Sequence, residues 1–275
     1  MYKRQDTDSV YIRFDELVEK FKPKNAVDFL DTIAKDKVEP FINQSYQELA
    51  EYTHAYDQKM QMKREVIADK GIWTAKKRYI LNAHDVEGVR YQEPKLKIMG
   101  IEAVKSSTPA PCREKIKQAL TIIMDGDEKE LNTFIQDFRT EFLTLPPEDV
   151  AYPRSVNGLD KWTESHNLFK KGAPIHCKGA ILYNHLIKKN KLGYKYPLIQ
   201  EGDKIKFLHM KLPNIYQSSS ISFITKLPKE ITFAVDYDLQ FEKSFVEPLN
   251  YIIEKIKWNV DRSYGTQGTL EDFFA

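Results

Sequence analysis

A short break rich in serine and proline divides the chain into two parts of different character. The run from Ser106 to Pro111 reads Ser-Ser-Thr-Pro-Ala-Pro, and such residues favour loops because they interrupt both helices and strands. Strand-like segments predominate before this run, whereas two segments with helical spacing follow it. We therefore predict an α+β fold with a boundary between residues 105 and 106.

The first part is predicted to contain strands together with one long helical segment. Apolar residues recur at helical spacing between positions 26 and 56, and Pro40 interrupts them, so we expect two helices or one kinked helix packed on a core. Val10, Ile12 and Phe14 alternate with Ser9, Tyr11 and Arg13, which is typical of a half-buried strand. Further strand-like runs are Met60 to Ala68, Ile72 to Leu81 and Lys95 to Ile101.

The second part is predicted to be mainly helical with some strand. Apolar residues at i, i+3 and i+4 indicate helices, and short apolar runs indicate strands. The expected helices are Arg113 to Met124, Glu128 to Leu143 and Leu239 to Trp258, and the expected strands are Lys204 to Leu208 and Ile221 to Ile224.

Composition excludes several classes of protein. No run of about 18 apolar residues is present, which a membrane-spanning helix needs. Lys and Arg number 42 against 40 Asp and Glu, so any attraction to nucleic acid must come from a local patch. Cys112 and Cys177 form no Cys-x-x-Cys pair, so neither a disulfide framework nor a zinc site is indicated. Because the first residues form no apolar signal segment, we expect a cytoplasmic protein, in the host cytoplasm if it is viral.

Two carboxylates stand directly before the first predicted strand. Asp6 and Asp8 are two residues apart, so both can point the same way from a hairpin. Paired carboxylates can hold Mg²⁺, which prefers oxygen ligands. The alternative is a solvated turn, because aspartates are abundant in turns.

The same residues begin a resemblance to a known family. Asp6-Thr7-Asp8-Ser9, followed by Val10-Tyr11, resembles the palm motif C of family B DNA polymerases. Other segments resemble the T-even-like phage members of that family in the same order, so the resemblance covers nearly the whole chain. These segments are Met62 to Ala68, Trp73 to Tyr79, Glu93 to Glu102, Lys105 to Pro109, His176 to Asn184 and Phe241 to Phe245.

The resemblance implies a partial polymerase palm, an antiparallel sheet with helices over residues 1–105. A mainly helical thumb over 106–261 and a flexible tail over 262–275 would follow it. The family's exonuclease domain, first palm aspartate motif and fingers have no counterpart, so the chain is similar to the last third of such an enzyme. Gln5 stands where the family usually has glycine, which affects the hairpin because glycine alone adopts positive φ freely. Lys63 stands where these phage enzymes usually carry aspartate, and it adds positive charge beside the expected metal site.

The resemblance gives Asp6 and Asp8 the roles of catalytic metal ligands for two Mg²⁺ ions shared with a partner chain. Two such ions act in nucleotidyl transfer on the primer 3′-hydroxyl and the incoming triphosphate. Glu65 is a weaker catalytic candidate on a neighbouring strand. Its alternative is a surface glutamate paired with Lys63 or Arg64.

Lysines and a tyrosine form the expected DNA-binding set. Lys76, Lys77 and Tyr79 resemble the family's Lys-Lys-x-Tyr element, which meets the primer and template duplex. Seven lysines and no Asp or Glu occur between Ser165 and Gln200, which indicates a basic stripe that can bind phosphates. The alternative for both sets is a solvated surface. The full expected set is Lys76, Lys77, Tyr79, Lys97, Lys170, Lys171, Lys178, Lys188 and Lys189.

Two further features are a group of histidines with a cysteine and the C-terminal tail. His176, Cys177 and His185 come with neither a ligand quartet nor an orienting acid, so a metal or Cys-His catalytic site is not indicated. The C-terminal tail resembles the peptide that binds sliding clamps, in which apolar residues of one helical turn enter a partner's pocket. The alternative is a tail that folds back onto its own thumb. The expected clamp-binding residues are Gln267, Leu270, Phe273 and Phe274.

Two functions are thus expected from the sequence. The first is the C-terminal palm and thumb subunit of a split DNA-directed DNA polymerase. Its expected partners are primer-template DNA, dNTP, an N-terminal polymerase fragment that carries the exonuclease, motif A and fingers, and a sliding clamp. The second is a non-catalytic, clamp-tethered DNA-binding module or a truncated remnant.

Overall fold

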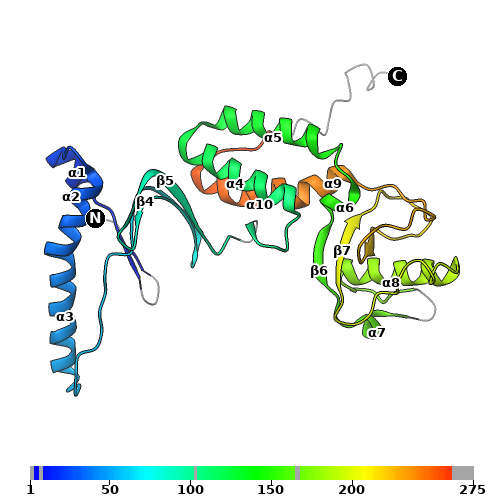
Figure 1. The fold of residues 1–275 in the computed structure, drawn as a ribbon, viewed down its shortest axis with the longest axis horizontal. Helices are drawn as coiled ribbons and strands as arrows, with labels where there is room; N and C mark the ends of the chain where they lie inside the picture. Colours follow the sequence, from blue (N-terminus) through cyan, green and yellow to red (C-terminus); the bar gives the residue numbers. More distant parts are fainter. Residues whose placement is uncertain (1–2, 6–8, 102–103, 165–167, 262–275) are drawn as a thin grey trace. The chain divides into compact units, whose positions relative to one another are not determined.

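The computed structural model describes residues 3–5, 9–101, 104–164 and 168–261. It divides the chain into two compact units, Met1–Gly100 and Ile101–Ala275 (Figure 1). Both units combine helices with antiparallel strands, which confirms the α+β class. The division into a palm part and a thumb stays a prediction. No helix among the described residues is long and apolar enough to cross a membrane.

The first unit contains a two-stranded hairpin, a helical segment and a three-stranded sheet. The sheet has the order β3-β4-β5, and both neighbouring pairs are antiparallel. Its strands are shifted from the expected positions, because β3 begins only at Val66 and residues 60–65 precede it without strand structure. The elements are β1 (Lys3–Gln5), β2 (Val10–Ile12), α1 (Asp15–Phe21), α2 (Ala26–Ile33), η1 (Ala34–Val38), α3 (Glu39–Tyr52), β3 (Val66–Ala75), β4 (Arg78–Val86) and β5 (Val89–Met99).

The long helical segment is continuous through Pro40. The side chain of Asn25 begins it by accepting hydrogen bonds from the N–H groups of Val27 and Asp28, at 3.0 and 3.2 Å. A π-helical turn, η1, then joins α2 to α3, and Pro40 follows this turn as the second residue of α3. The expectation that this segment packs on a core is wrong for α3, since only Ala50 of its 14 residues is buried.

An ion-pair network joins α2 to the three-stranded sheet. Arg64, directly before β3, donates hydrogen bonds to Asp31 of α2 at 2.7 Å and to Asp85 of β4. Arg90 of β5 donates to Asp85 at 3.1 Å and also pairs with Asp28 of α2. The side chain of Asp85 is only 2% exposed and that of Arg64 12%. These charges therefore stabilise the fold only as a connected set, because burying one of them alone is costly.

The second unit has an aromatic core formed by the helix at Glu128–Phe142 and the helical segment at 237–246. Phe138 of α5 contacts Phe142, Phe241 and Phe245, with ring centroids 5.8, 5.7 and 4.8 Å away. The expected helices at 113–124, 128–143 and 239–258 are confirmed, although the last contains a π-helical turn. The elements are α4 (Ala110–Asp125), α5 (Glu128–Phe142), α6 (Pro147–Val150), β6 (Tyr152–Ser155), α7 (Leu159–Trp162), α8 (Ile175–Lys189), β7 (Lys204–His209), β8 (Ser220–Phe223), α9 (Tyr237–Phe241), η3 (Glu242–Val246), α10 (Glu247–Ile253) and η4 (Glu254–Ile256).

Helix α8 lies directly against β8 of the sheet β6-β7-β8. A Cβ atom on Gly179 would lie 2.5 Å from Ser222 Oγ and 2.8 Å from Ser222 N, so only glycine permits this approach. Ser220 and Ser222 donate hydrogen bonds to the carbonyl groups of Ile175 and His176, at 2.7 and 2.9 Å. Contact without an intervening side chain and these two bonds fix the helix to the strand.

Candidate functional site

The two strands that bracket Asp6 and Asp8 form an antiparallel hairpin. Gln5 of β1 pairs with Val10 of β2, so residues 6–9 connect two adjacent strand ends. Asp6 and Asp8 themselves lie outside the described residues. Gln5 is part of a paired strand, a conformation that does not require glycine.

Strand β2 turns Tyr11 toward the three-stranded sheet. The ring of Tyr11 contacts Trp73 and Tyr79 edge-on, with centroids 5.3 and 5.5 Å apart. Burial raises the pKa of Tyr11 above its ordinary value, and a hydrogen bond with the Tyr79 hydroxyl is the second-largest cause. The expected alternation is therefore wrong at two positions, because Val10 is 38% exposed and Tyr11 is partly buried.

Glu65 is paired with Lys97 rather than with its sequence neighbours. Its carboxylate accepts a hydrogen bond from the Lys97 ammonium group on β5. The alternative pairing with Arg64 is wrong, since the Arg64 guanidinium contacts Asp31 and Asp85. Both Glu65 and Lys97 are candidate site residues, and the sheet brings them together across 32 positions of sequence. Sequence reasoning gave no signal for this contact.

Lys76 and Lys77 form the tight turn between β3 and β4. Ala75 pairs with Arg78, so the two lysines are the turn residues, and both are exposed. Lys77 has φ of 59°, in the left-handed region. Tyr79 follows in β4 and contacts Tyr11. The turn lysines, Tyr79 and the hairpin strand β2 therefore belong to one neighbourhood of the first unit.

The lysines of the second unit differ in their surroundings. Lys178 is half-buried, and its ammonium nitrogen lies 5.6 Å from the centre of the Phe169 ring. Lys195 pairs with Glu230, which is far away in the sequence. The hydrogen bond from the Lys195 ammonium group is the main cause that lowers the pKa of Glu230, to about 2. An acid-free stretch of sequence is therefore not free of acids in space. The remaining lysines of the stretch are exposed and comprise Lys170, Lys171, Lys188, Lys189 and Lys191.

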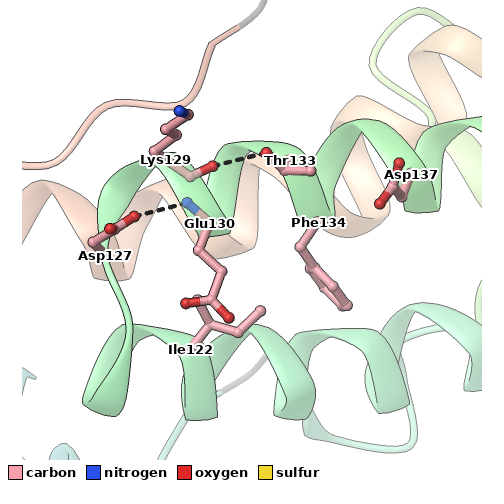
Figure 2. Close-up of a pocket in the computed structure, with 7 residues that line it drawn as sticks. All are labelled: Ile122, Asp127, Lys129, Glu130, Thr133, Phe134 and Asp137. Carbon is pink, nitrogen blue, oxygen red and sulfur yellow. Dashed lines mark hydrogen bonds between the residues drawn. The ribbon is translucent and has the colours of Figure 1, made fainter.

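A pocket between α4 and α5 is lined by three acidic side chains and one lysine (Figure 2). Its net charge is negative, so it repels the phosphates of DNA. The Asp127 carboxylate accepts a hydrogen bond from the Glu130 N–H at 2.8 Å and caps α5, and the Thr133 hydroxyl donates to the Lys129 carbonyl at 3.0 Å (Figure 2). These two hydrogen bonds pair polar groups of α5 and its cap with one another. The lining residues are Ile122, Asp127, Lys129, Glu130, Thr133, Phe134 and Asp137.

Neither a metal cluster nor an activated thiol is found in the part of the chain that the structure describes. No group of three or more His, Cys, Asp or Glu side chains there could hold a metal ion. Burial raises the pKa of the Cys177 thiol and lowers that of His176. The thiol is therefore protonated at neutral pH, which disfavours nucleophilic chemistry.

Comparison with known proteins identifies relatives over almost the whole chain. No family model matches. The DNA-directed DNA polymerase of Enterobacteria phage T4 is 34% identical over an alignment 290 positions long, which covers 98% of this chain and 31% of that protein. The DNA-directed DNA polymerase of Escherichia phage RB69 is 35% identical over 289 residues, with the same coverage. The chain is thus similar over almost its whole length to two phage DNA-directed DNA polymerases.

The match covers only part of each relative, so the activity of the whole relative does not carry over to this chain. The chain spans about a third of the length of these curated relatives. This similarity supports a polymerase-related C-terminal region. The roles of individual residues remain predictions.

Proposed function

We propose that this chain is the palm and thumb part of a DNA-directed DNA polymerase and that it works with a second polypeptide. The observation that carries the proposal is the 34–35% identity to two phage polymerases over 98% of the chain. The second polypeptide would supply the exonuclease, the first palm aspartate motif and the fingers. Primer-template DNA and dNTP would be the substrates.

The proposed metal ligands are Asp6 and Asp8, with Glu65 as a weaker catalytic candidate. Carboxylate oxygens fit Mg²⁺, and the hairpin strands on either side support a shared position for the two aspartates. Mg²⁺ bound there would lower the pKa of the primer 3′-hydroxyl and neutralise charge on the triphosphate. Glu65 already faces Lys97. A further carboxylate from the second polypeptide is therefore part of the proposal.

Lys76, Lys77 and Tyr79 would contact the primer-template duplex near the hairpin, and the exposed lysines of the second unit would contact phosphates further along it. Phosphate contacts position a protein on DNA without reading its sequence. The proposed clamp-binding residues Gln267, Leu270, Phe273 and Phe274 lie outside the described residues. Their assignment rests on the sequence pattern.

The salt dependence of DNA binding distinguishes the exposed Lys188 and Lys189 from Lys195, which is paired with Glu230. Each phosphate contact contributes about −0.9 to the slope of log K against log salt concentration. We expect Lys188→Ala with Lys189→Ala to reduce the magnitude of this slope by about 1.8. Fluorescence anisotropy with a primer-template at several salt concentrations measures it. Lys195→Ala is the control, because Lys195 is paired with Glu230. A change of about 0.9 in that variant, the full value of one phosphate contact, would contradict the assignment.

Primer extension tests the proposed function. The chain alone and the chain mixed with a polypeptide carrying the missing polymerase parts are incubated with Mg²⁺, dNTPs and a primed template. We expect DNA binding by the chain alone and extension only in the mixture. Extension by the chain alone would refute the need for a second polypeptide, and extension in neither reaction would refute the polymerase role.

A non-catalytic DNA-binding module tethered to a clamp is the second candidate. The pairing of Glu65 with Lys97 favours it, because that carboxylate is already neutralised. Such a module would bind primed DNA in a salt-sensitive manner and would not require Asp6 or Asp8.

A further inference from the structure

The hairpin on either side of the proposed metal ligands is separate from the larger sheet of its unit. Strands β1 and β2 have three residues each. Among the described strands they pair with one another, while β3, β4 and β5 form a sheet of their own. A hairpin of two short strands is at best marginally stable by itself in water. Its position in the unit therefore depends on side-chain contacts.

Tyr11 makes such a contact between the hairpin and the sheet. Its ring lies edge-on against Trp73 of β3 and Tyr79 of β4, with centroids 5.3 and 5.5 Å away. Trp73 and Tyr79 are partners in the register of β3 and β4, so their side chains lie on the same face of the sheet. Aromatic pairs in this edge-on geometry attract one another beyond the effect of the buried area alone. Displacing the hairpin along the sheet would disrupt both contacts.

This contact joins two segments that have different proposed roles. Tyr11 follows Asp8 by three residues, and Trp73 precedes the turn of Lys76 and Lys77 by three residues. Tyr79 is itself one of the proposed primer-template contacts. The ring of Tyr11 therefore connects the strand next to the proposed metal ligands with the strands that carry the proposed DNA contacts.

We propose that Tyr11 is a positioning residue for nucleotidyl transfer, an inference that rests on the proposed function. Its ring keeps the hairpin of Asp6 and Asp8 in a fixed position relative to Tyr79, and hence relative to the bound primer. The ring itself neither binds DNA nor takes part in the reaction. Reacting groups must be held about 3 to 3.5 Å apart, and a displacement of about 1 Å can cost about 100-fold in rate.

Truncation and conservative replacement of Tyr11 test this role in the mixture with the second polypeptide. With saturating dNTP and primer-template, we expect Tyr11→Ala to slow single-turnover extension at least about 30-fold. Tyr11→Phe keeps the ring and should extend within about threefold of the unchanged chain. Fluorescence anisotropy should show primer-template affinity within about threefold for both variants, because Tyr11 makes no proposed contact with DNA.

Tyr91→Ala is the matched control, because it makes the same truncation at another half-buried tyrosine of the first unit. Tyr91 lies in β5, and the Lys95 ammonium nitrogen is 4.5 Å from the centre of its ring. Extension by this variant should stay within about threefold of the unchanged chain.

Amide hydrogen exchange measures the contact in the chain alone, without the reaction. In Tyr11→Ala we expect the amides of β1 and β2 to exchange at least about tenfold faster, because local opening of the hairpin becomes easier. Exchange in β3, β4 and β5 should change less than about threefold. This comparison separates displacement of the hairpin from unfolding of the whole unit.

Extension by Tyr11→Ala at the rate of the unchanged chain would overturn the inference and leave the proposed function intact. A loss of rate that Tyr11→Phe shares would assign the effect to the hydroxyl group, and a parallel loss of primer-template affinity would assign it to DNA binding; either result overturns the inference. Faster exchange throughout the first unit would show a purely structural role and overturn it as well. Absence of extension by the unchanged chain in the mixture would overturn the proposed function together with the inference.

Discussion

Replacing Asp6 and Asp8 together by alanine is expected to abolish primer extension by the assembled polymerase, with a loss of at least about a thousandfold. Metal ions contribute several kcal/mol to charge stabilisation in such reactions, and each 1.36 kcal/mol corresponds to about tenfold in rate. Loss of both carboxylates removes the proposed ligands from this chain. Single-turnover extension of a primed template measures the effect.

The control for this experiment removes equal charge elsewhere in the first unit. Glu16 and Asp36 are exposed, and their replacement by alanine should leave extension within about twofold. DNA binding by the Asp6 and Asp8 variant should be unchanged or slightly tighter, because two negative charges are removed. Extension that survives in this variant would show that the hairpin does not hold the catalytic metal ions, and the DNA-binding module would then be preferred.

Asp85→Ala is expected to lower the free energy of unfolding of the first unit by about 3 to 5 kcal/mol, because it leaves buried charge without its partner. The Asp85 carboxylate accepts hydrogen bonds from Arg64, Arg90 and the Gly88 N–H. Urea unfolding followed by the fluorescence of Trp73 measures this change in a background with Trp162→Phe and Trp258→Phe, which leaves Trp73 as the single tryptophan.

The exposed pair of Arg13 and Asp15 provides the comparison. Its side chains are 66 and 53% exposed, and exposed pairs contribute about 0 to 1 kcal/mol. Asp15→Ala should therefore change the stability little. Equal effects of Asp85→Ala and Asp15→Ala would contradict the structural role of the buried network.

The pH dependence of Asp85→Asn checks the same network. Burial alone would raise the pKa of Asp85, but the hydrogen bonds from Arg64, Arg90 and Gly88 outweigh it and hold the pKa below the ordinary value of 3.8. A group with a lowered pKa contributes stability above its unfolded pKa and loses it as the pH falls through the folded value. The difference between the unchanged chain and Asp85→Asn should therefore narrow below about pH 4.

Local patterns predicted the amphipathic helices well and the buried or long-range features poorly. Helices α4 and α5 carry a clear apolar stripe, and the sequence located both. Helix α8 was missed because its centre, Gly179 to Tyr183, is an unbroken run of buried residues, which hides the helical period although Lys188 and Lys189 are exposed.

Pairings between distant positions were beyond local reasoning. The contact of Glu65 with Lys97 depends on the register of the sheet, and that of Lys195 with Glu230 spans 35 positions. Tyr11 is turned inward by its contacts with Trp73 and Tyr79, so alternation failed at Val10 and Tyr11 although it held at Ile12. The roles of Asp6, Asp8 and the tail stay predictions.

The close approach of Gly179 to β8 has a consequence for the lysines on the same helix. Gly179 lies against β8, and Ser220 and Ser222 of that strand donate hydrogen bonds to the α8 carbonyl groups of Ile175 and His176. Sliding or rolling the helix on the sheet would break these bonds. Lys188 and Lys189, at the C-terminal end of α8, therefore keep fixed positions relative to β6-β7-β8. A ligand that meets these two charges does so without the entropy cost of first ordering the backbone that carries them.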